Sequence, residues 1–285
     1  MSKKSSIPHN TDKPLNYGVE LKKMPFVHDD IIKAHRDDHC VFILQKTGDI
    51  RTEIDFKDYD ITGAALGFIM PGQVHRYFFR KESNGWFVFI DYSLIKNPYR
   101  DIIFDFQGVC QVVTIEGKDS IFGMIALLEN ILRDTTNVLT PSLIASITDA
   151  LVGMIASKII QEKNISYSTN KHQFQITRDY KLMVKEKYKE SKQVLEYANR
   201  LNITPLYLNE VIKNITGYPA SYWIQQEIIL EARRLLYYTS LDIKQIAYEL
   251  GYEDNAYFSR FFKKNTGITP VDFRAKNHYL SNNTH

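Results

Sequence analysis

Short apolar runs separated by turn residues fill the first hundred positions of the chain. They lie at residues 40–45, 50–56, 66–70, 75–80 and 85–90. In the second run, every other residue from Ile50 to Phe56 is apolar or Thr and the residues between them are charged, which is the period of a strand with one buried face. Several such strands at close spacing are typical of an all-β barrel or sandwich, so we predict one here.

The hydrophobic period changes after Asp119. Ile121, Ile125 and Leu128 belong to a stripe with the 3.6-residue repeat of an amphipathic helix, and a second stripe follows Thr140-Pro141, an N-cap with Pro in the first turn. The sequence therefore predicts two helices directly after the strands. Such a pair either closes a small barrel or forms the contact between two subunits, and the pattern leaves both open.

A domain boundary is predicted at residues 164–177, where polar side chains with little periodicity form a linker composition. This places an N-terminal domain at residues 1–163 and a C-terminal domain at residues 178–285. Residues after Arg178 follow helical periods throughout. The chain as a whole is therefore predicted to be α+β.

Two segments of the C-terminal domain repeat each other at offsets of 49 to 51 residues. Ala198, Leu201 and Asn202 recur as Ala247, Leu250 and Gly251; Tyr207, Leu208, Ile212, Thr216 and Gly217 recur as Tyr257, Phe258, Phe262, Thr266 and Gly267; Pro219 and Tyr222 recur as Pro270 and Phe273. An offset that drifts by one residue at loop positions indicates two copies of one supersecondary unit. Two copies are too few for a solenoid, which needs about three or more repeats.

Each copy is predicted to be a helix-turn-helix. In the second copy, Asp242 begins a capping box, Gly251 ends the first helix and Asp254 is the N-cap of the next. In the first copy, Asn202 takes the place of Gly251 and tolerates left-handed dihedrals, and Thr204-Pro205 starts the second helix. In this motif the second helix enters the major groove of DNA.

A long helix is predicted at residues 219–238, between the two copies. At ~1.5 Å per residue it spans about 30 Å, close to the ~34 Å pitch of B-DNA. One chain can therefore place its two second helices in successive major grooves.

The outward faces of the two second helices carry the candidate DNA contacts, whereas Tyr257, Phe258 and Phe262 are expected in the core. The outward residues are Leu206, Asn209, Glu210 and Lys213 in the first copy and Asn255, Ala256, Ser259, Arg260 and Lys263 in the second. Arg260 offers paired donors to guanine, and the lysines suit phosphate. Glu210 either accepts from cytosine or is solvated, and both remain open.

Composition agrees with two globular domains. The chain has 285 residues, 44% of them hydrophobic, against roughly 150 residues for one domain. The net charge is only +3, but residues 178–285 hold 16 Lys and Arg against 12 Asp and Glu, while the rest of the chain is at −1. This asymmetry permits phosphate contacts and is too small to prove them. Cys40 and Cys110 are the only cysteines, which excludes a disulfide framework and a four-Cys zinc site.

The sequence predicts a cytoplasmic location and no membrane association. The basic residues 1–6 are not followed by the apolar segment of a signal peptide. The most apolar long stretch, residues 142–160, contains Asp149 and Lys158 and falls short of the ~18 uncharged residues of a membrane span.

Residues 246–274 closely resemble the signature of AraC-type transcriptional regulators, and the resemblance extends upstream over the first copy and the joining helix, about a hundred residues in all. It implies sequence-specific binding of promoter DNA by two helix-turn-helix units, with RNA polymerase as a further partner. It also implies a regulatory N-terminal domain that is commonly a cupin-like β-barrel and often dimerises through the helices after the barrel.

The N-terminal domain resembles a cupin at two places. Residues 71–75 look like the second cupin motif, and residues 34–42 fall at the first, where Asp37 replaces the second His of a His-x-His pair. Along an extended strand His35 and His39 would lie ~13 Å apart, too far to share one ion unless the segment bends. We therefore expect no metal and no cofactor. His35, His39 and His75 are instead candidates for a small-molecule effector pocket at the barrel mouth.

The leading hypothesis is a transcriptional regulator, an activator and a homodimer, with no catalytic residues and an N-terminal domain that senses a small molecule or positions the second subunit. The alternative is a cupin-type metalloenzyme with a helical appendage. It would bind its metal with ligands from His35, Asp37, His39 and His75. A third possibility is a helical domain that binds only protein.

Overall fold

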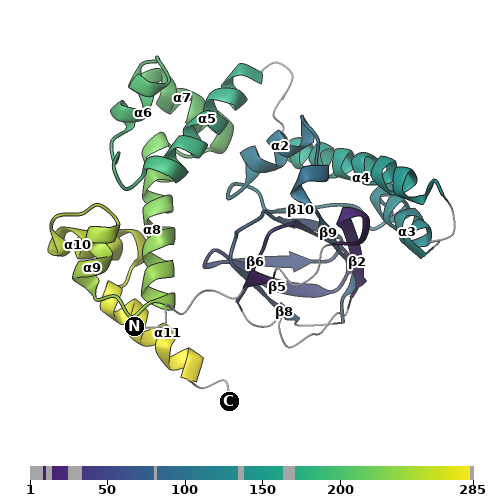
Figure 1. Ribbon diagram of the computed structural model, residues 1–285, viewed down its shortest axis with the longest axis horizontal. Helices are drawn as coiled ribbons and strands as arrows, with labels where there is room; N and C mark the ends of the chain where they lie inside the picture. Colours follow the sequence, from purple (N-terminus) through teal and green to yellow (C-terminus); the bar gives the residue numbers. More distant parts are fainter. Residues whose placement is uncertain are drawn as a thin grey trace. The chain divides into compact units, whose positions relative to one another are not determined.

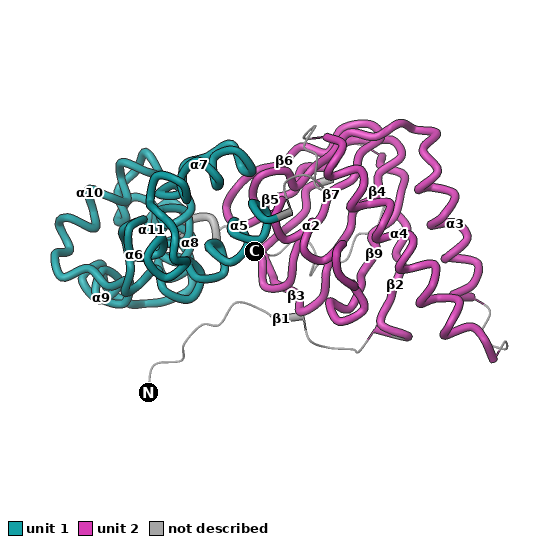
Figure 2. The backbone as a smooth tube through the Cα atoms, turned by 90° about the horizontal axis from the view of Figure 1, so that it is seen from above, with its two compact units in different colours: residues 1–7, 170–285 teal, residues 8–169 magenta. Residues whose placement is uncertain are grey.

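The computed structural model describes residues 9–10, 15–24, 34–79, 82–133, 138–162 and 171–282. The chain forms two compact units (Figure 2): an N-terminal unit within residues 8–169 and a C-terminal unit within residues 170–285. Among the described residues all strands lie in the first unit, and the second is helical. The fold class is therefore α+β.

Two antiparallel sheets form the N-terminal unit. The five-stranded sheet has the order β10 (Val112–Thr114), β7 (Ala65–Ile69), β4 (Cys40–Thr47), β9 (Asn84–Ile90) and β2 (Val19–Lys23), and the three-stranded sheet has the order β6 (Lys57–Thr62), β5 (Asp49–Ile54) and β8 (His75–Phe79). A short parallel pair, β1 (His9–Asn10) with β3 (Arg36–Asp37), lies beside them. One apolar core takes Ile43 and Phe87 from the first sheet and Ile50 and Ile61 from the second, so the two sheets face each other. The five predicted runs correspond to β4, β5, β7, β8 and β9.

The second predicted run was drawn too long. Strand β5 ends at Ile54, and Asp55 and Phe56 have φ values of 49° and 63° before the chain returns in β6. A two-residue hairpin loop of type I′ needs positive φ at both central residues, and Phe is an unusual residue there. The Asp55 carboxylate supports the turn, because it accepts from Val74 N at 3.2 Å and from Gln73 Nε2 at 3.0 Å. Strand β6 was missed because Phe56 continued the apolar alternation.

Three helices accompany the sheets: α2 (Tyr99–Phe106), α3 (Ser120–Arg133) and α4 (Thr140–Glu162). In Figure 1 they lie along one side of the sheets. Trp86 Nε1 on β9 donates to Glu129 Oε2 on α3 at 3.4 Å, and Lys23 Nζ on β2 lies 3.1 Å from the same carboxylate, so α3 packs on the five-stranded sheet. Strand β7 and the first six residues of β4 are buried on both faces, and both strands show continuous apolar runs in place of alternation. Both helices predicted after the strands are confirmed as α3 and α4.

Helix α4 is the one helix in the described ranges that is long and apolar enough to cross a membrane by length and composition alone, and 39% of its most apolar window is buried. Its buried residues recur every three or four positions, at Ile144, Thr148, Leu151, Ile155 and Ile159. This spacing is that of an amphipathic helix with one face in a protein core. We therefore assign α4 to the core of the N-terminal unit.

Seven helices are described in the C-terminal unit. They are α5 (Lys171–Lys187), α6 (Val194–Arg200), α7 (Pro205–Thr216), α8 (Ala220–Tyr238), α9 (Ile243–Glu249), α10 (Asn255–Thr266) and α11 (Pro270–Asn282). Helix α8 runs between the α6–α7 pair and the α9–α10 pair (Figure 1). The predicted linker is too long at its C-terminal end, because residues 171–177 already belong to α5 and bury Phe174 and Thr177. Residues 163–170 lie outside the described residues.

The two helix pairs share the same backbone geometry at their turns. In the first, Ile203 N donates to Ala198 O at 3.1 Å, and in the second Tyr252 N donates to Ala247 O at 2.9 Å, 49 positions later. Asn202 and Gly251 both have positive φ, 55° and 73°. The capping box at Asp242 and the predicted caps at Thr204 and Asp254 are all present. The duplicated motif inferred from the repeat is therefore confirmed.

A third helix completes each pair. On the first, Tyr180 on α5 donates its hydroxyl to Ala220 O at 2.6 Å and packs edge-on against Tyr197. On the second, Phe273 on α11 packs edge-on against Phe262, and Arg274 donates to Leu236 O in the last turn of α8 and to Leu241 O beyond its end. Each end of α8 is thereby fixed by a helix outside the two helix-turn-helix pairs, α5 at its start and α11 at its end.

Gly251 and Gly267 offer a matched pair of substitutions. Both have left-handed dihedrals, but a Cβ at Gly251 would lie 2.0 Å from Lys189 O, whereas one at Gly267 would meet nothing within 4 Å. We expect Gly267→Ala to lower the free energy of unfolding by about 1–2 kcal/mol through its dihedrals alone. Gly251→Ala should lose about 1–3 kcal/mol more through the backbone clash.

The measurement is urea unfolding of the full chain carrying Trp86→Phe, so that Trp223 fluorescence reports the C-terminal unit. Equal losses for the two substitutions would contradict the close approach of Gly251 to Lys189.

Candidate functional site

Helix α10 presents the second set of predicted DNA contacts. Asp254 Oδ1 accepts from Ala256 N at 2.7 Å and caps the helix, and Phe258 and Phe262 are fully buried. Asn255, Ala256, Arg260 and Lys263 are exposed, as predicted. Arg260 Nη2 lies 3.9 Å from Asp254 Oδ2, and this solvent-exposed pair is weak enough to open when another acceptor arrives.

Ser259 and Asn209 differ from the expectation that they face solvent freely. Ser259 is half-buried and its hydroxyl donates to Asn255 O at 2.9 Å. Asn209 is also half-buried, and its Oδ1 accepts from Ala220 N at 3.0 Å. Because the N-cap Pro219 makes no side-chain cap hydrogen bond, Asn209 supplies the missing acceptor for the first turn of α8.

The remaining predicted residues of α7 are exposed. Leu206 is 71% exposed, and Glu210 and Lys213 lie on the same outward side. Thr204 Oγ1 accepts from Tyr207 N at 3.2 Å and fixes the start of the helix. An apolar side chain this exposed at the start of a helix-turn-helix second helix is available for contact with a thymine methyl group.

Two tyrosines at equivalent positions were missed. Tyr257 was expected in the core but is 56% exposed, and Tyr207 is 38% exposed. Each precedes a fully buried residue, Phe258 or Leu208, and one residue is a rotation of ~100° on a helix. The repeat contained the signal, because a tyrosine recurs at the same place in both copies.

The two outward faces differ in charge. At an offset of 50 residues, Glu210 corresponds to Arg260, Lys213 to Lys263 and Asn214 to Lys264. Arg260, Lys264 and Lys192 also line a groove of about 390 Å³ beside α8 and α10, together with Tyr252 and Tyr257. The positive charge of the candidate interface is therefore concentrated on the second helix pair.

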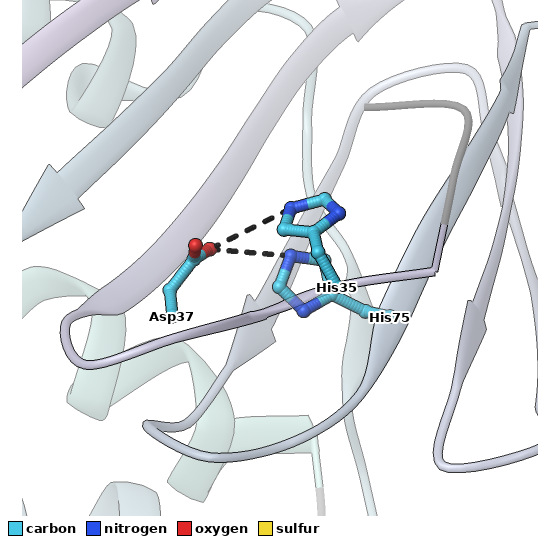
Figure 3. Close-up of side chains that lie close together, drawn as sticks. All are labelled: His35, Asp37 and His75. Atoms are coloured by element: carbon cyan, nitrogen blue, oxygen red, sulfur yellow. Dashed lines mark ion pairs between the residues drawn. The ribbon is translucent and has the colours of Figure 1, made fainter. Parts of the chain in front are cut away.

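The predicted effector residues come together in the N-terminal unit. The chain bends at residues 38–39, and Asp37 Oδ2 lies 3.9 Å from His35 Nε2, 3.7 Å from His39 Nε2 and 3.3 Å from His75 Nε2. Figure 3 shows His35 and His75 turned towards the Asp37 carboxylate. The separation of ~13 Å expected for an extended strand is wrong, because the segment is not extended.

This cluster is almost closed to solvent. Asp37 and His75 are 4% and 2% exposed. Burial alone would raise the pKa of Asp37, but the close contact and charge of His75 and the charges of His39 and His35 outweigh it, so the pKa of Asp37 lies below its usual value. Burial is also the main cause that lowers the pKa of His39, against the charge of Asp37. The carboxylate is therefore charged at neutral pH, inside the protein.

Comparison with known proteins bears on the C-terminal unit. A family model described as a helix-turn-helix domain matches residues 197–276. The arabinose operon regulatory protein of Salmonella typhimurium is 32% identical over 82 residues, 29% of either chain. The transcriptional activator RhaR of Enterobacter sp. is 33% identical over 91 residues, 32% of this chain and 29% of the relative. The match therefore spans less than a third of these relatives' length.

A solved structure is similar over the same region. The C-terminal domain of AraT, a response regulator from Geobacillus stearothermophilus, is 30% identical and covers 35% of this chain and 84% of its own, with a TM-score of 0.34. The matched relatives are named as regulators. Residues 197–276 of the C-terminal unit are therefore a helix-turn-helix domain, similar in sequence to the matching segments of these regulators.

Proposed function

We propose that the whole chain is a sequence-specific transcriptional regulator that binds promoter DNA, with α7 and α10 inserted into successive major grooves. The observation that carries this proposal is the duplicated, capped helix-turn-helix whose second helices keep polar side chains exposed. Helix α8 has 19 residues, so at ~1.5 Å per residue it separates the two pairs by about 29 Å, close to one turn of B-DNA.

The side chains divide into base readers and phosphate contacts. Arg260 carries a planar pair of donors that matches guanine O6 and N7, and Asn255 and Ala256 sit beside it at the start of α10. Lys263 lies one turn after Arg260, and Lys213 lies one turn after Glu210. Both lysines suit contact with phosphate. On α7, Leu206 contacts bases through its apolar side chain. Glu210 stands where the second copy has Arg260, and because a carboxylate can only accept, it accepts from the amino group of cytosine.

The N-terminal unit is proposed to regulate binding in a cytoplasmic homodimer that activates transcription with RNA polymerase. Leu127 near the end of α3 and Val138, Leu139 and Leu143 around the start of α4 are exposed apolar side chains close together in sequence. Such a patch suits burial against the same patch of a second subunit. The buried cluster around Asp37 is the proposed effector site. In this proposal residues 1–163 regulate, and the helical unit that begins with α5 at Lys171 binds DNA.

Genomic footprinting of the full chain tests the function. We expect protected sites with two major-groove contacts one helical turn apart, and an affinity that falls steeply with salt because phosphate contacts release counterions. A chain that protects no site and shows no salt-dependent affinity for DNA would contradict the proposal and favour a helical domain that binds protein.

Replacing Arg260 by Ala tests the base-reading role. We expect affinity for the preferred site to fall by about 1–3 kcal/mol, or ~5- to 150-fold, with relaxed preference at one base position. The measurement is fluorescence anisotropy against a site series with each base pair changed in turn. Lys263→Ala is the matched control and should weaken all sequences alike and reduce the salt slope by about 1. If Arg260→Ala behaves in the same way as the control, Arg260 contacts phosphate.

Replacing Asn209 by Ala tests the assignment of that residue to structure. Loss of the cap on Ala220 N should lower the free energy of unfolding by about 0.5–2 kcal/mol and leave base preference unchanged. Asn214→Ala, an exposed residue of the same helix, should change stability by less than about 0.5 kcal/mol. Trp223 fluorescence in urea and the same site series measure both effects. A change of base preference in Asn209→Ala would place Asn209 on DNA.

A further inference from the structure

The buried cluster of the N-terminal unit has the spacing of a set of metal ligands. Three possible ligand atoms lie within 4.8 Å of one another, one each from His35, Asp37 and His75. All three side chains are buried. The nitrogen-to-oxygen distances of 3.3 and 3.9 Å are longer than a good hydrogen bond. Donors bonded at ~2.0–2.2 Å to one tetrahedral ion lie about 3.3–3.6 Å from each other. The cluster is therefore closer to a coordination polyhedron than to a hydrogen-bonded network.

The orientation of His75 is fixed from its other ring nitrogen. His75 Nδ1 lies 3.0 Å from Gln73 O, so the Nδ1–H group donates to this carbonyl, and in the neutral ring Nε2 then keeps its lone pair. Gln73 is itself held, because its Oε1 accepts from Met70 N at 2.9 Å. A histidine oriented by a backbone carbonyl in this way is the usual support for a metal ligand.

The lone pair of His75 Nε2 then faces the Asp37 carboxylate at 3.3 Å, where both side chains are nearly inaccessible to water. Apart from this long contact with Asp37, His75 Nε2 has no hydrogen-bond partner among the described residues. Two electron-rich atoms this close and this buried repel each other unless a positive charge lies between them. That charge is either a proton or a metal ion. A proton on His75 Nε2 would need only the Asp37 carboxylate as its acceptor and would not involve the nearby His35 imidazole. A metal ion would bind all three side chains, so the presence of His35 favours the ion.

We propose that His35, Asp37 and His75 bind one divalent first-row transition-metal ion. Two imidazoles and one carboxylate are a donor set for Zn²⁺, Mn²⁺, Fe²⁺, Co²⁺ or Ni²⁺, whereas Mg²⁺ and Ca²⁺ prefer all-oxygen sites. Three protein ligands leave at least one coordination position for water or for an oxygen donor of a small molecule. The site stands whether or not the proposed function of the chain is correct.

Tyr77 marks a polar group for such a bound molecule. It lies two residues after His75 on β8, so both side chains point to the same face of the strand, and their rings are 5.4 Å apart. Its hydroxyl is buried and has no hydrogen-bond partner among the described residues. A ligand oxygen on the metal would supply the acceptor that this hydroxyl needs.

Metal titration of the chelator-treated full chain tests the site. With Co²⁺ and Zn²⁺ as probes, we expect one ion per chain by equilibrium dialysis, a visible d–d absorption band for Co²⁺ and a Tm that rises with metal concentration. Asp37→Asn and His75→Gln each remove a ligand and should weaken binding by more than the ~10–100-fold typical for loss of an outer-shell partner. His172→Gln, an exposed histidine of α5, is the matched control and should bind like the unchanged chain.

Two results overturn the proposal. The first is binding that is absent at millimolar metal, which leaves a proton as the bridging charge. The second is binding that survives in folded Asp37→Asn and His75→Gln. Circular dichroism shows whether these variants fold. If they do not, electron paramagnetic resonance of Cu²⁺ bound to the unchanged chain decides between the outcomes: hyperfine coupling to two histidine nitrogens supports the site, and its absence excludes it.

Discussion

The packing of both helix-turn-helix pairs on α8 is the interaction on which the DNA-binding geometry depends. A helix-turn-helix pair is too small to bury its own apolar face, so each pair uses α8 and one further helix to complete its core. The two ends of α8 are fixed by side chains from outside the helix: Asn209 accepts from the first turn, and Arg274 donates to carbonyls at the end. The distance between the reading helices is therefore a property of one folded unit and does not vary as a linker would.

The two turns show why the repeat was readable from sequence. Each turn needs one residue with positive φ followed by a new N-cap, and very few residue types satisfy either requirement. Gly251 and Asn202 meet the first, and Asp254 and Thr204 meet the second, all through bonds to residues within five positions. Local chemistry of this kind is fully present in the sequence. This is why the starts of α7, α9 and α10 were predicted well and the hairpin loop at Phe56, a residue atypical of its turn, was not.

Site residues were harder to predict wherever their partner is distant in sequence. Asn209 looked like a base reader because its helix position is outward, and nothing in its neighbourhood indicates that it bonds to Ala220, eleven residues later. Tyr257 looked like core because it is aromatic, whereas its exposure follows from the position of Phe258 one residue on. The exposure of Arg260 and Lys263, in contrast, follows from helical periodicity alone.

The histidine cluster follows from how the two sheets meet. His35 pairs with His75 of the three-stranded sheet, with backbone bonds of 3.0 and 2.8 Å, while β4 pairs with β7 and β9 in the five-stranded sheet from Cys40 on. Residues 38–39 must therefore carry the chain from one sheet to the other, and a strand that changes sheets has to bend. The bend brings His35 and His39 to either side of the same carboxylate. A sequence pattern predicts each strand but not the sheet to which it is bonded, so a site built at the crossing between sheets becomes visible only when the pairing is known.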